Sequence, residues 1–193
     1  MPNAIMQCIR TRRSVRHYTD KPVDGKHIET LIEAARWAPS GGNNQTAHFA
    51  FISNADALNT LNSLIRTTFL TWQPDDNYGP KLAARKKAEN EHVNFFFNAP
   101  LLVIASNEEH YQNGMADCAT ALQNILLAAT SLGLGSCWVN QLRWLREEKI
   151  IRNFLTRFGV PQNHLVCGGA VIGHGETVPS APARKEGTWT LTR

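Results

Sequence analysis

The sequence predicts an α+β domain in which helices flank a mixed central β-sheet. Apolar residues recur with helical spacing in some segments, and short apolar runs typical of strands lie between them. These segments do not alternate in the regular strand–helix–strand order of a doubly wound sheet, and no internal repeat or linker divides the chain. We therefore expect one domain over residues 1–193.

Helices are expected where apolar residues form a stripe with a spacing of three and four residues. Asp24 suits the N-cap of the second helix, and Gly133 suits the left-handed position that ends the longest one. Pro80 suits the first turn of another helix, whose basic side chains, beginning with Lys81, are expected to face solvent. The expected helices span residues 4–10, 24–38, 55–69, 80 onward, 114–132 and 145–158.

Strands are expected in four short runs that are rich in β-branched and other apolar residues. The run over 101–105 is apolar throughout and is therefore expected at the centre of the sheet. From Gly173 onward the chain is polar and contains two prolines, which is typical of an arm that lies on another surface. The expected strands span residues 48–53, 101–105, 135–139 and 165–172.

Composition points to a soluble, cytoplasmic protein. The four cysteines include no C-x-x-C pair, and each lies among apolar or small residues, so we expect buried, reduced thiols. The N-terminus lacks the apolar core of a signal peptide, and no apolar run approaches the roughly 18 residues of a membrane span. The net charge of +4 is too modest to indicate nucleic acid as a partner.

Residues 10–18 carry the densest charge in the chain. Four arginines fall within seven positions, with Ser14 among them. Guanidinium groups are planar, forked and permanently charged, so this cluster suits the oxygens of a phosphate group. A solvated basic face at the end of a helix would give the same pattern, and the residues by themselves leave both interpretations open.

The sequence offers no catalytic constellation of its own. It has neither a dinucleotide-binding G-x-G-x-x-G nor a Walker loop, and its seven histidines lack metal-ligand spacing. Ser40 and His48 could form a nucleophile and base, but no G-x-S-x-G elbow surrounds the serine. We therefore expect no catalytic side chain and no metal, and a bound cofactor would carry the chemistry.

Four motifs, in order along almost the whole chain, together resemble the FMN-dependent nitroreductase family. The first is the arginine–serine segment followed by Tyr18, and the second is an A-P-S-x-x-N-x-Q type of segment that ends at Gln45. The motifs are Arg12–Arg16, Ala35–Gln45, Leu132–Trp138, and Gly169–Gly173 with Pro182–Lys185.

The resemblance implies a homodimer with a C-terminal arm and with FMN at the subunit interface. It implies that Arg16 approaches the pyrimidine edge of the flavin, and that the loop after Ala38 comes from the partner subunit. By this analogy the phosphate and ribityl chain are held by Arg12, Arg13, Ser14 and Arg184, and the ring is lined by Pro39, Ser40, Gly41 and Asn43 on one side and by Trp138, Val139 and Asn140 on the other.

The activity that the resemblance implies is NAD(P)H-dependent reduction of nitroaromatic, quinone or similar acceptors. NADPH or NADH would transfer hydride to flavin N5, and after the nicotinamide leaves, the acceptor would be reduced at the same face in a ping-pong scheme. The family also contains flavin-fragmenting and dehalogenating members, which usually carry a larger lid than residues 70–80 can form. A non-catalytic nucleotide- or RNA-binding module is the alternative from another class, although no RNP pattern is present.

Several residues have a plainer interpretation that the sequence leaves open. Trp138 would serve equally as a core tryptophan, and Ser40 as a turn residue after Pro39. Thr46 stands where the family usually has proline, and Asn140–Gln141 replaces the acidic–glycine pair of some members. The second change touches the surroundings of the flavin ring.

Overall fold

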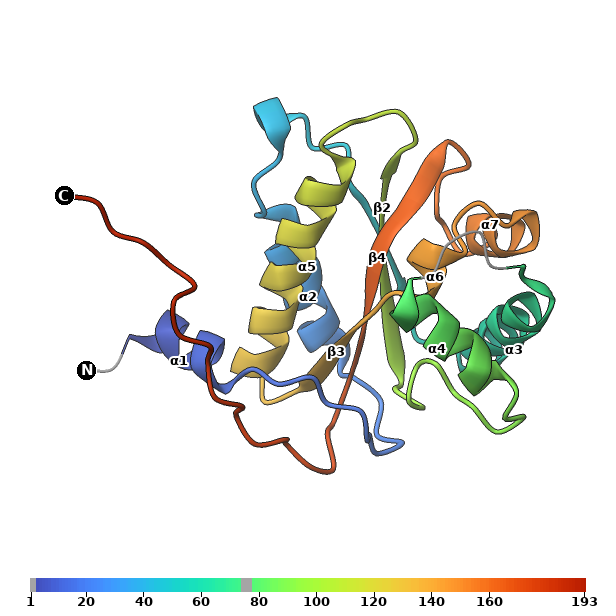
Figure 1. Cartoon of the computed structure of the whole chain (residues 1–193), viewed down its shortest axis with the longest axis horizontal. Helices are drawn as coiled ribbons and strands as arrows, with labels where there is room; N and C mark the ends of the chain where they lie inside the picture. Colours follow the sequence, from blue (N-terminus) through green and yellow to red (C-terminus); the bar gives the residue numbers. More distant parts are fainter. Residues whose placement is uncertain (1–2, 74–77) are drawn as a thin grey trace.

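The computed structural model describes residues 3–73 and 78–193, and its centre is a four-stranded antiparallel sheet. The strand order is β1 (His48–Ile52), β2 (Leu101–Glu108), β4 (His164–Gly173) and β3 (Gly135–Val139) (Figure 1). All four expected strands are present. The sheet was expected to be mixed, but β1 to β4 pair in antiparallel fashion. Among the described residues, the parallel pairing is the isolated bridge between Ser14 and Ser136.

The two central strands are β2 and β4, as the apolar sequence of β2 predicts. Leu101–Ala105 is buried along its whole length and pairs with the second half of β4. A register shift follows Ala105, where the apolar run ends at Ser106. Continuous burial on both faces explains why these strands lack the alternating polar residues of a sheet with one solvated face.

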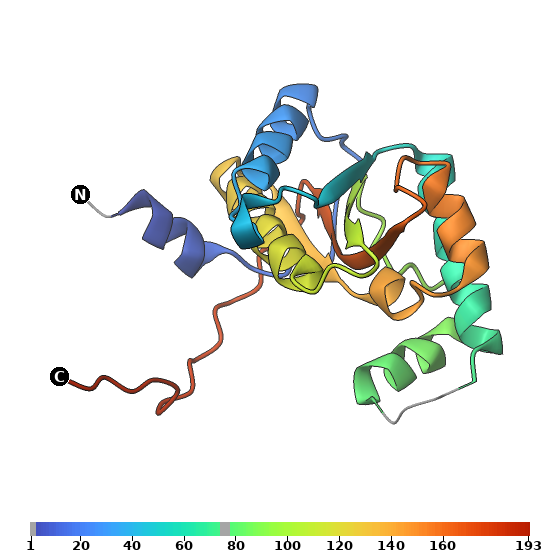
Figure 2. The ribbon, with the colours of Figure 1, turned by 90° about the horizontal axis from the view of Figure 1, so that it is seen from above.

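Helices cover both faces of the sheet and create two separate cores (Figures 1 and 2). One face carries α2 (Gly25–Arg36) and α5 (Gly114–Ser131). The other face carries α3 (Ala55–Thr71), α4 (Gly79–Ala88), α6 (Gln141–Trp144) and α7 (Lys149–Thr156). None of the helices within residues 3–73 and 78–193 is long and apolar enough to cross a membrane.

The expected helix ends are confirmed where a cap residue marks them. The Lys26 amide donates to the Asp24 carboxylate at the start of α2, with N and Oδ1 2.8 Å apart. Gly133 has φ of +73° just after α5, as a left-handed terminal residue requires. The bounds expected for the 145–158 helix are wrong, because Glu148 is extended and the helix runs only over Lys149–Thr156, while the short α6 precedes residue 145.

Two expectations about burial are also corrected. Lys81 is buried rather than solvated, and its ammonium lies 4.1 Å from the centre of the Trp72 ring, where the face of the ring attracts a cation. Cys118, Cys137 and Cys167 are buried free thiols, but Cys8 is only half-buried. Cys8 belongs to α1 (Ala4–Thr11), which buries none of its residues in the chain as described.

The chain ends leave the body on the same side (Figure 2). Gly175 forms an isolated bridge with Tyr18, and from residue 176 the tail is exposed and forms no helix or strand, in agreement with the expected arm. Large apolar side chains are exposed on both α1 and the tail, among them Ile5, Ile9, Trp189 and Leu191. Part of the candidate lid over residues 70–80 lies in residues 74–77, outside the described residues.

Because α5 packs closely against β4, a larger residue at Gly168 is predicted to reduce the stability of the protein. A β-carbon there would lie 2.7 Å from Cζ2 of Trp138 and 3.0 Å from Cδ1 of Leu122. We expect Gly168→Ala to lower the free energy of unfolding by about 1–3 kcal/mol, because a rigid ring cannot yield to the added methyl group. Urea unfolding measures the difference. Gly25→Ala, where no atom lies within 4 Å, is the control, and equal losses in the two variants would contradict the packing argument.

A second prediction concerns His164, at the start of β4. Its Nδ1 lies 3.3 Å from the Ser106 hydroxyl, and its ring centre lies 6.2 Å from that of His48. Burial and the neighbouring His48 lower the pKa of His164, with Glu108 opposing them. The folded state therefore binds fewer protons than the unfolded state as pH falls below about 7, and the free energy of unfolding decreases.

The measurement is urea unfolding at pH 7.5 and pH 5.5. We expect His164→Gln to reduce the difference in stability between the two pH values, because the side chain no longer titrates. His92→Gln, at an exposed position, should leave the difference unchanged. An unaltered pH dependence in His164→Gln would show that other groups cause it.

Candidate functional site

The arginine segment is held against the exposed edge of β3. Ser14 forms the isolated bridge with Ser136, and the Val15 amide donates to the Ser136 carbonyl at 3.0 Å. Val15 is buried, and the buried Tyr18 hydroxyl donates to its carbonyl at 2.7 Å. Burial raises the pKa of Tyr18, so this donor keeps its proton. The backbone that carries the arginines is thus fixed by sheet-like pairing.

Two arginines of this segment face a cavity of about 220 Å³. Its wall includes Arg12, Arg13 and the turn formed by Gly133, Leu134 and Gly135. Nη1 of Arg13 donates to the carbonyls of Arg10 and Arg12, at 2.7 Å each, which fixes the guanidinium group. Its Nε is buried without a hydrogen-bond partner. An oriented guanidinium with an unused donor beside a second arginine fits a phosphate group.

Arg16 lies further along the segment and is exposed. Its Nη1 is 3.3 Å from the Ser14 carbonyl, and its guanidinium carbon is 5.9 Å from the centre of the Phe97 ring. Phe97 and Asn98 both have φ near +55°, a left-handed conformation that side chains rarely adopt. The Arg16 guanidinium therefore lies above the Phe97 ring and is still accessible to a ligand.

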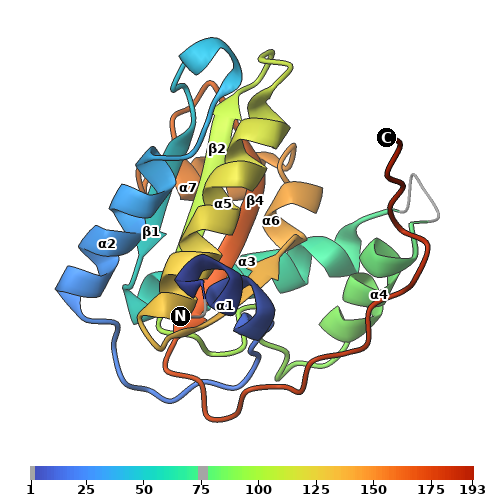
Figure 3. The ribbon, with the colours of Figure 1, turned by 90° about the vertical axis from the view of Figure 1, so that its left-hand side faces the viewer.

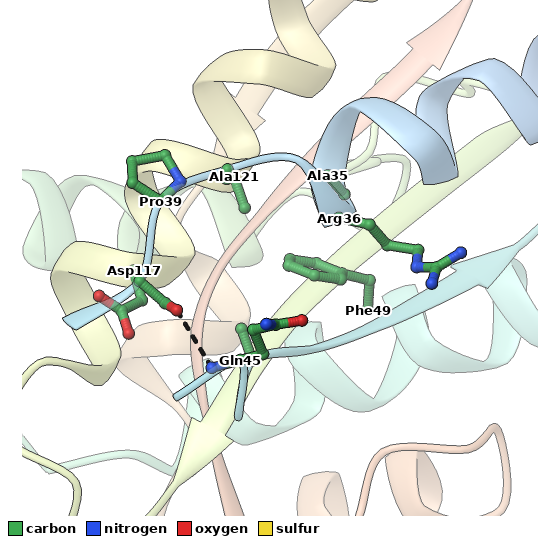
Figure 4. A pocket seen from close by; sticks show the side chains of 10 residues that line it. Ala35, Arg36, Pro39, Gln45, Phe49, Asp117 and Ala121 are labelled. Carbon is green, nitrogen blue, oxygen red and sulfur yellow. Dashed lines mark hydrogen bonds between the residues drawn. The ribbon is translucent and has the colours of Figure 1, made fainter. Parts of the chain in front are cut away.

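The second predicted segment forms a tight loop between α2 and β1. It contains one turn of 3₁₀ helix, η1 (Gly41–Asn43), and its backbone is left-handed at Gly42, Asn43 and Gln45. The Ser40 hydroxyl accepts from the Gln45 amide at 3.1 Å (dashed line in Figure 4), so Ser40 does stabilise the turn. The Gln45 side chain also donates to Asn43, at 3.1 Å.

Three side chains that the sequence analysis missed hold this loop against α5. Both carboxylate oxygens of Asp117 accept from the Gly41 amide, at 3.0 and 3.3 Å. The Thr120 hydroxyl shares its proton between the Asp117 carbonyl, at 2.8 Å, and the Pro39 carbonyl, at 3.2 Å. The Tyr111 hydroxyl donates to the Gly41 carbonyl at 3.1 Å. A signal was present in the sequence, because Asp117 is an acidic residue in the first turn of a helix that carries no other charge.

The end of β3 brings together the third predicted group. Trp138 is half-buried, its ring lies over Gly168, and its indole N–H donates to Oδ1 of Asn140 at 2.8 Å. The Val139 side chain is buried in the opposite core. Trp138 thus packs partly against the core that contains α5, while the adjoining backbone lies on the strand edge next to the arginine segment.

The structure does not bring all predicted residues together in one chain. Pro39, Ser40, Gly41 and Asn43 lie beside Asp117 near the start of α5, whereas Arg12 and Arg13 lie beside Thr130 near its end. These positions are separated by roughly three and a half turns, or about 20 Å along the helix axis. Figures 1 and 3 show η1 and α1 at opposite ends of α5. Arg184 lies on the exposed tail and forms no hydrogen bond or ion pair with any described residue.

Within residues 3–73 and 78–193, no cluster of three or more His, Cys, Asp or Glu side chains is arranged to hold a metal ion. The candidate site consists of three parts. They are the cavity beside Arg12 and Arg13, called here the arginine seat, the edge of β3, and the separate loop around η1.

Comparison with known proteins places this arrangement in a family. The model of the Nitroreductase family matches residues 9–174, and the chain belongs to this family. A protein from Archaeoglobus fulgidus, named as a candidate NADH dehydrogenase/NAD(P)H nitroreductase, is 29% identical over 169 residues, which are 88% of this chain and 84% of that protein. An FMN reductase [NAD(P)H] from Bacillus subtilis is 27% identical over 89% of this chain and 66% of its own length.

A solved structure extends the similarity to the whole fold. A nitroreductase with bound FMN from Bacteroides fragilis matches with a TM-score of 0.91 and 36% sequence identity, and the match covers 99% of this chain and 100% of that one. The α+β nitroreductase-like fold is thereby confirmed.

Proposed function

We propose that this protein is an FMN-dependent NAD(P)H oxidoreductase that reduces nitroaromatic, quinone or similar acceptors in a ping-pong scheme. The observation that carries the proposal is the seat beside β3, where Arg12 lies next to an oriented Arg13 whose Nε is buried and unpartnered. Membership of the Nitroreductase family and the similarity to an FMN-bound structure support the same conclusion.

The residues at the seat fit the phosphate end of FMN. Arg12 and Arg13 supply charged donors, and Ser14 adds a hydroxyl on the strand edge. Ser136, the backbone partner of this segment on β3, has a buried hydroxyl without a hydrogen-bond partner, but it does not line the cavity. A dianionic phosphate would satisfy several of these donors at once, and bidentate arginine contacts favour it over a neutral ligand.

The ring end of the cofactor would extend along β3 towards Trp138, Val139 and Asn140. FMN, when bound, supplies the redox chemistry of the reaction. Arg16 would place a positive charge at the pyrimidine edge, which lowers the free energy of a group that gains electrons. The remaining role of the chain is to bind and orient, which agrees with the lack of an acid–base constellation in its sequence.

The site is completed by a second copy of the chain in this proposal. One chain keeps its loop about 20 Å from its arginines, so that a two-fold related copy packed antiparallel along α5 would bring the loop of one to the arginines of the other. The outward face of α5 carries small side chains such as Ala116, Ala119 and Thr120, which permit close approach. The exposed apolar residues of α1 and of the tail that bears Arg184 would be covered in the same assembly.

The first prediction from this proposal is the visible absorption spectrum. The purified protein, or the protein after incubation with FMN, should show bands near about 370 and about 450 nm that disappear on anaerobic addition of NADPH or NADH. Initial rates at several acceptor concentrations should then give parallel double-reciprocal lines. A protein that stays colourless with FMN would refute the cofactor, and intersecting lines would refute the ping-pong scheme.

The second prediction tests the arginine seat. Arg12→Ala should weaken FMN binding about 10- to 100-fold, because a hydrogen bond to a charged group contributes about 1.5–3 kcal/mol. Quenching of FMN fluorescence measures the dissociation constant. Arg157→Ala, which removes an exposed arginine remote in sequence from the segment, should bind FMN as the wild type does. Equal weakening in both variants would point to net charge rather than to a specific seat.

A further inference from the structure

We propose that Asp117 is a positioning residue for FMN binding in trans: its buried carboxylate fixes the 39–45 loop so that the loop can close the flavin site of the partner copy. This inference rests on the proposed function. Asp117 does not belong to the arginine seat or to β3, and it would act through the loop rather than by touching the cofactor.

The loop needs an external restraint because its backbone is strained. Asn43 and Gln45 have φ of +56° and +53°, and Gly42 lies between Gly41 and Asn43 with φ of +60°. Such conformations cost about 1–2 kcal/mol for residues with a side chain and persist only where neighbouring groups impose them. The internal hydrogen bonds of Ser40 and Gln45 span the turn but do not connect it to the body.

Apolar packing does not supply this restraint. A cavity of about 170 Å³ lies between the loop and the body, as Figure 4 shows from close by. Its apolar lining consists of Phe49 and of residues with small side chains, which leave the space behind Pro39 unfilled. The apolar residues in this lining are Ala35, Ala38, Pro39, Ala47, Phe49 and Ala121.

Polar contacts from α5 and the turn before it therefore set the position of the loop. Asp117 has only 6% of its surface exposed, and its two oxygens share the Gly41 amide. Thr120 and Tyr111 bond the carbonyls on either side of that amide. The fit is close, because a β-carbon on Gly41 would lie 2.9 Å from the Tyr111 hydroxyl and still nearer to the Asn113 side chain.

The consequence concerns the residues that the loop presents. Pro39, Ser40 and Asn43 are the loop residues proposed to line the flavin ring of the partner. Because a carboxylate accepts a stronger hydrogen bond than a neutral group does, loss of the Asp117 carboxylate would release Gly41 and let the loop shift towards the cavity. The arginine seat on the same chain, about 20 Å away, would remain intact.

The single-variant experiment compares three substitutions by FMN titration. Asp117→Ala should raise the dissociation constant for FMN at least 10-fold, and Asp117→Asn, which keeps one acceptor oxygen, should recover most of the affinity. Hydrogen exchange at the Gly41 amide should accelerate in Asp117→Ala. Asp56→Ala, which removes the exposed acidic residue in the first turn of α3, is the matched control and should bind FMN normally.

The decisive experiment uses mixed dimers made by co-expressing Arg12→Ala and Asp117→Ala chains with different tags. If Asp117 acts in trans, one of the two sites in a mixed dimer combines intact arginines with an intact loop, and half of the sites bind FMN with wild-type affinity. If it acts within its own chain, every site is defective and the proposal is overturned. Normal FMN affinity in Asp117→Ala would also overturn it.

The result for the wild type separates this inference from the proposed function. A wild-type protein that does not bind FMN refutes the function itself, whatever the variants do. If Asp117→Ala does not fold, Thr120→Val removes the neighbouring hydroxyl contact to Pro39 at nearly constant volume, and the mixed dimers are made with that chain instead. The same half-site recovery is expected, and its absence contradicts the inference.

Discussion

The close packing of α5 against the central strands is the constraint on which the candidate site depends. Gly168 lets β4 approach the helix and the Trp138 ring, and Gly114 lets the start of the helix approach Asn107 of β2. A helix fixed in this way holds both of its ends rigidly. The arginine segment lies at one end and the 39–45 loop at the other, so a single packing interaction sets the geometry of two distant parts.

These two parts are held by different physical means. The arginine segment is fixed by backbone pairing to β3 and by the buried side chain of Val15, as an added strand would be. The loop is fixed by hydrogen bonds from Asp117, Thr120 and Tyr111 across a space that apolar groups do not fill. Polar contacts depend strongly on distance and angle, which makes the loop the more sensitive half of the site.

The proposed function needs the two halves to meet, and one chain keeps them at opposite ends of α5. In the proposed dimer, a two-fold axis would turn the separation along α5 into two equivalent contacts between copies. The apolar side chains that are exposed on α1 and on the tail indicate where the two copies would contact each other. Binding of the cofactor and association of the copies would then stabilise one another.

The sequence by itself determined the fold class, all four strands, the capped helix ends and the arginine segment. Each of these follows from local signals such as apolar periodicity, the Asp24 cap, the glycine after α5 or the density of charge. Only the tertiary structure decided that Lys81 is buried over Trp72, that the helix expected from residue 145 begins at Lys149, and that Asp117 holds Gly41. The burial of Lys81 and the bond of Asp117 depend on contacts between residues far apart in the chain. The start of the helix at Lys149 depends on a local competition between helix and turn, which neighbouring packing decides. No short-range sequence pattern encodes these contacts or this competition.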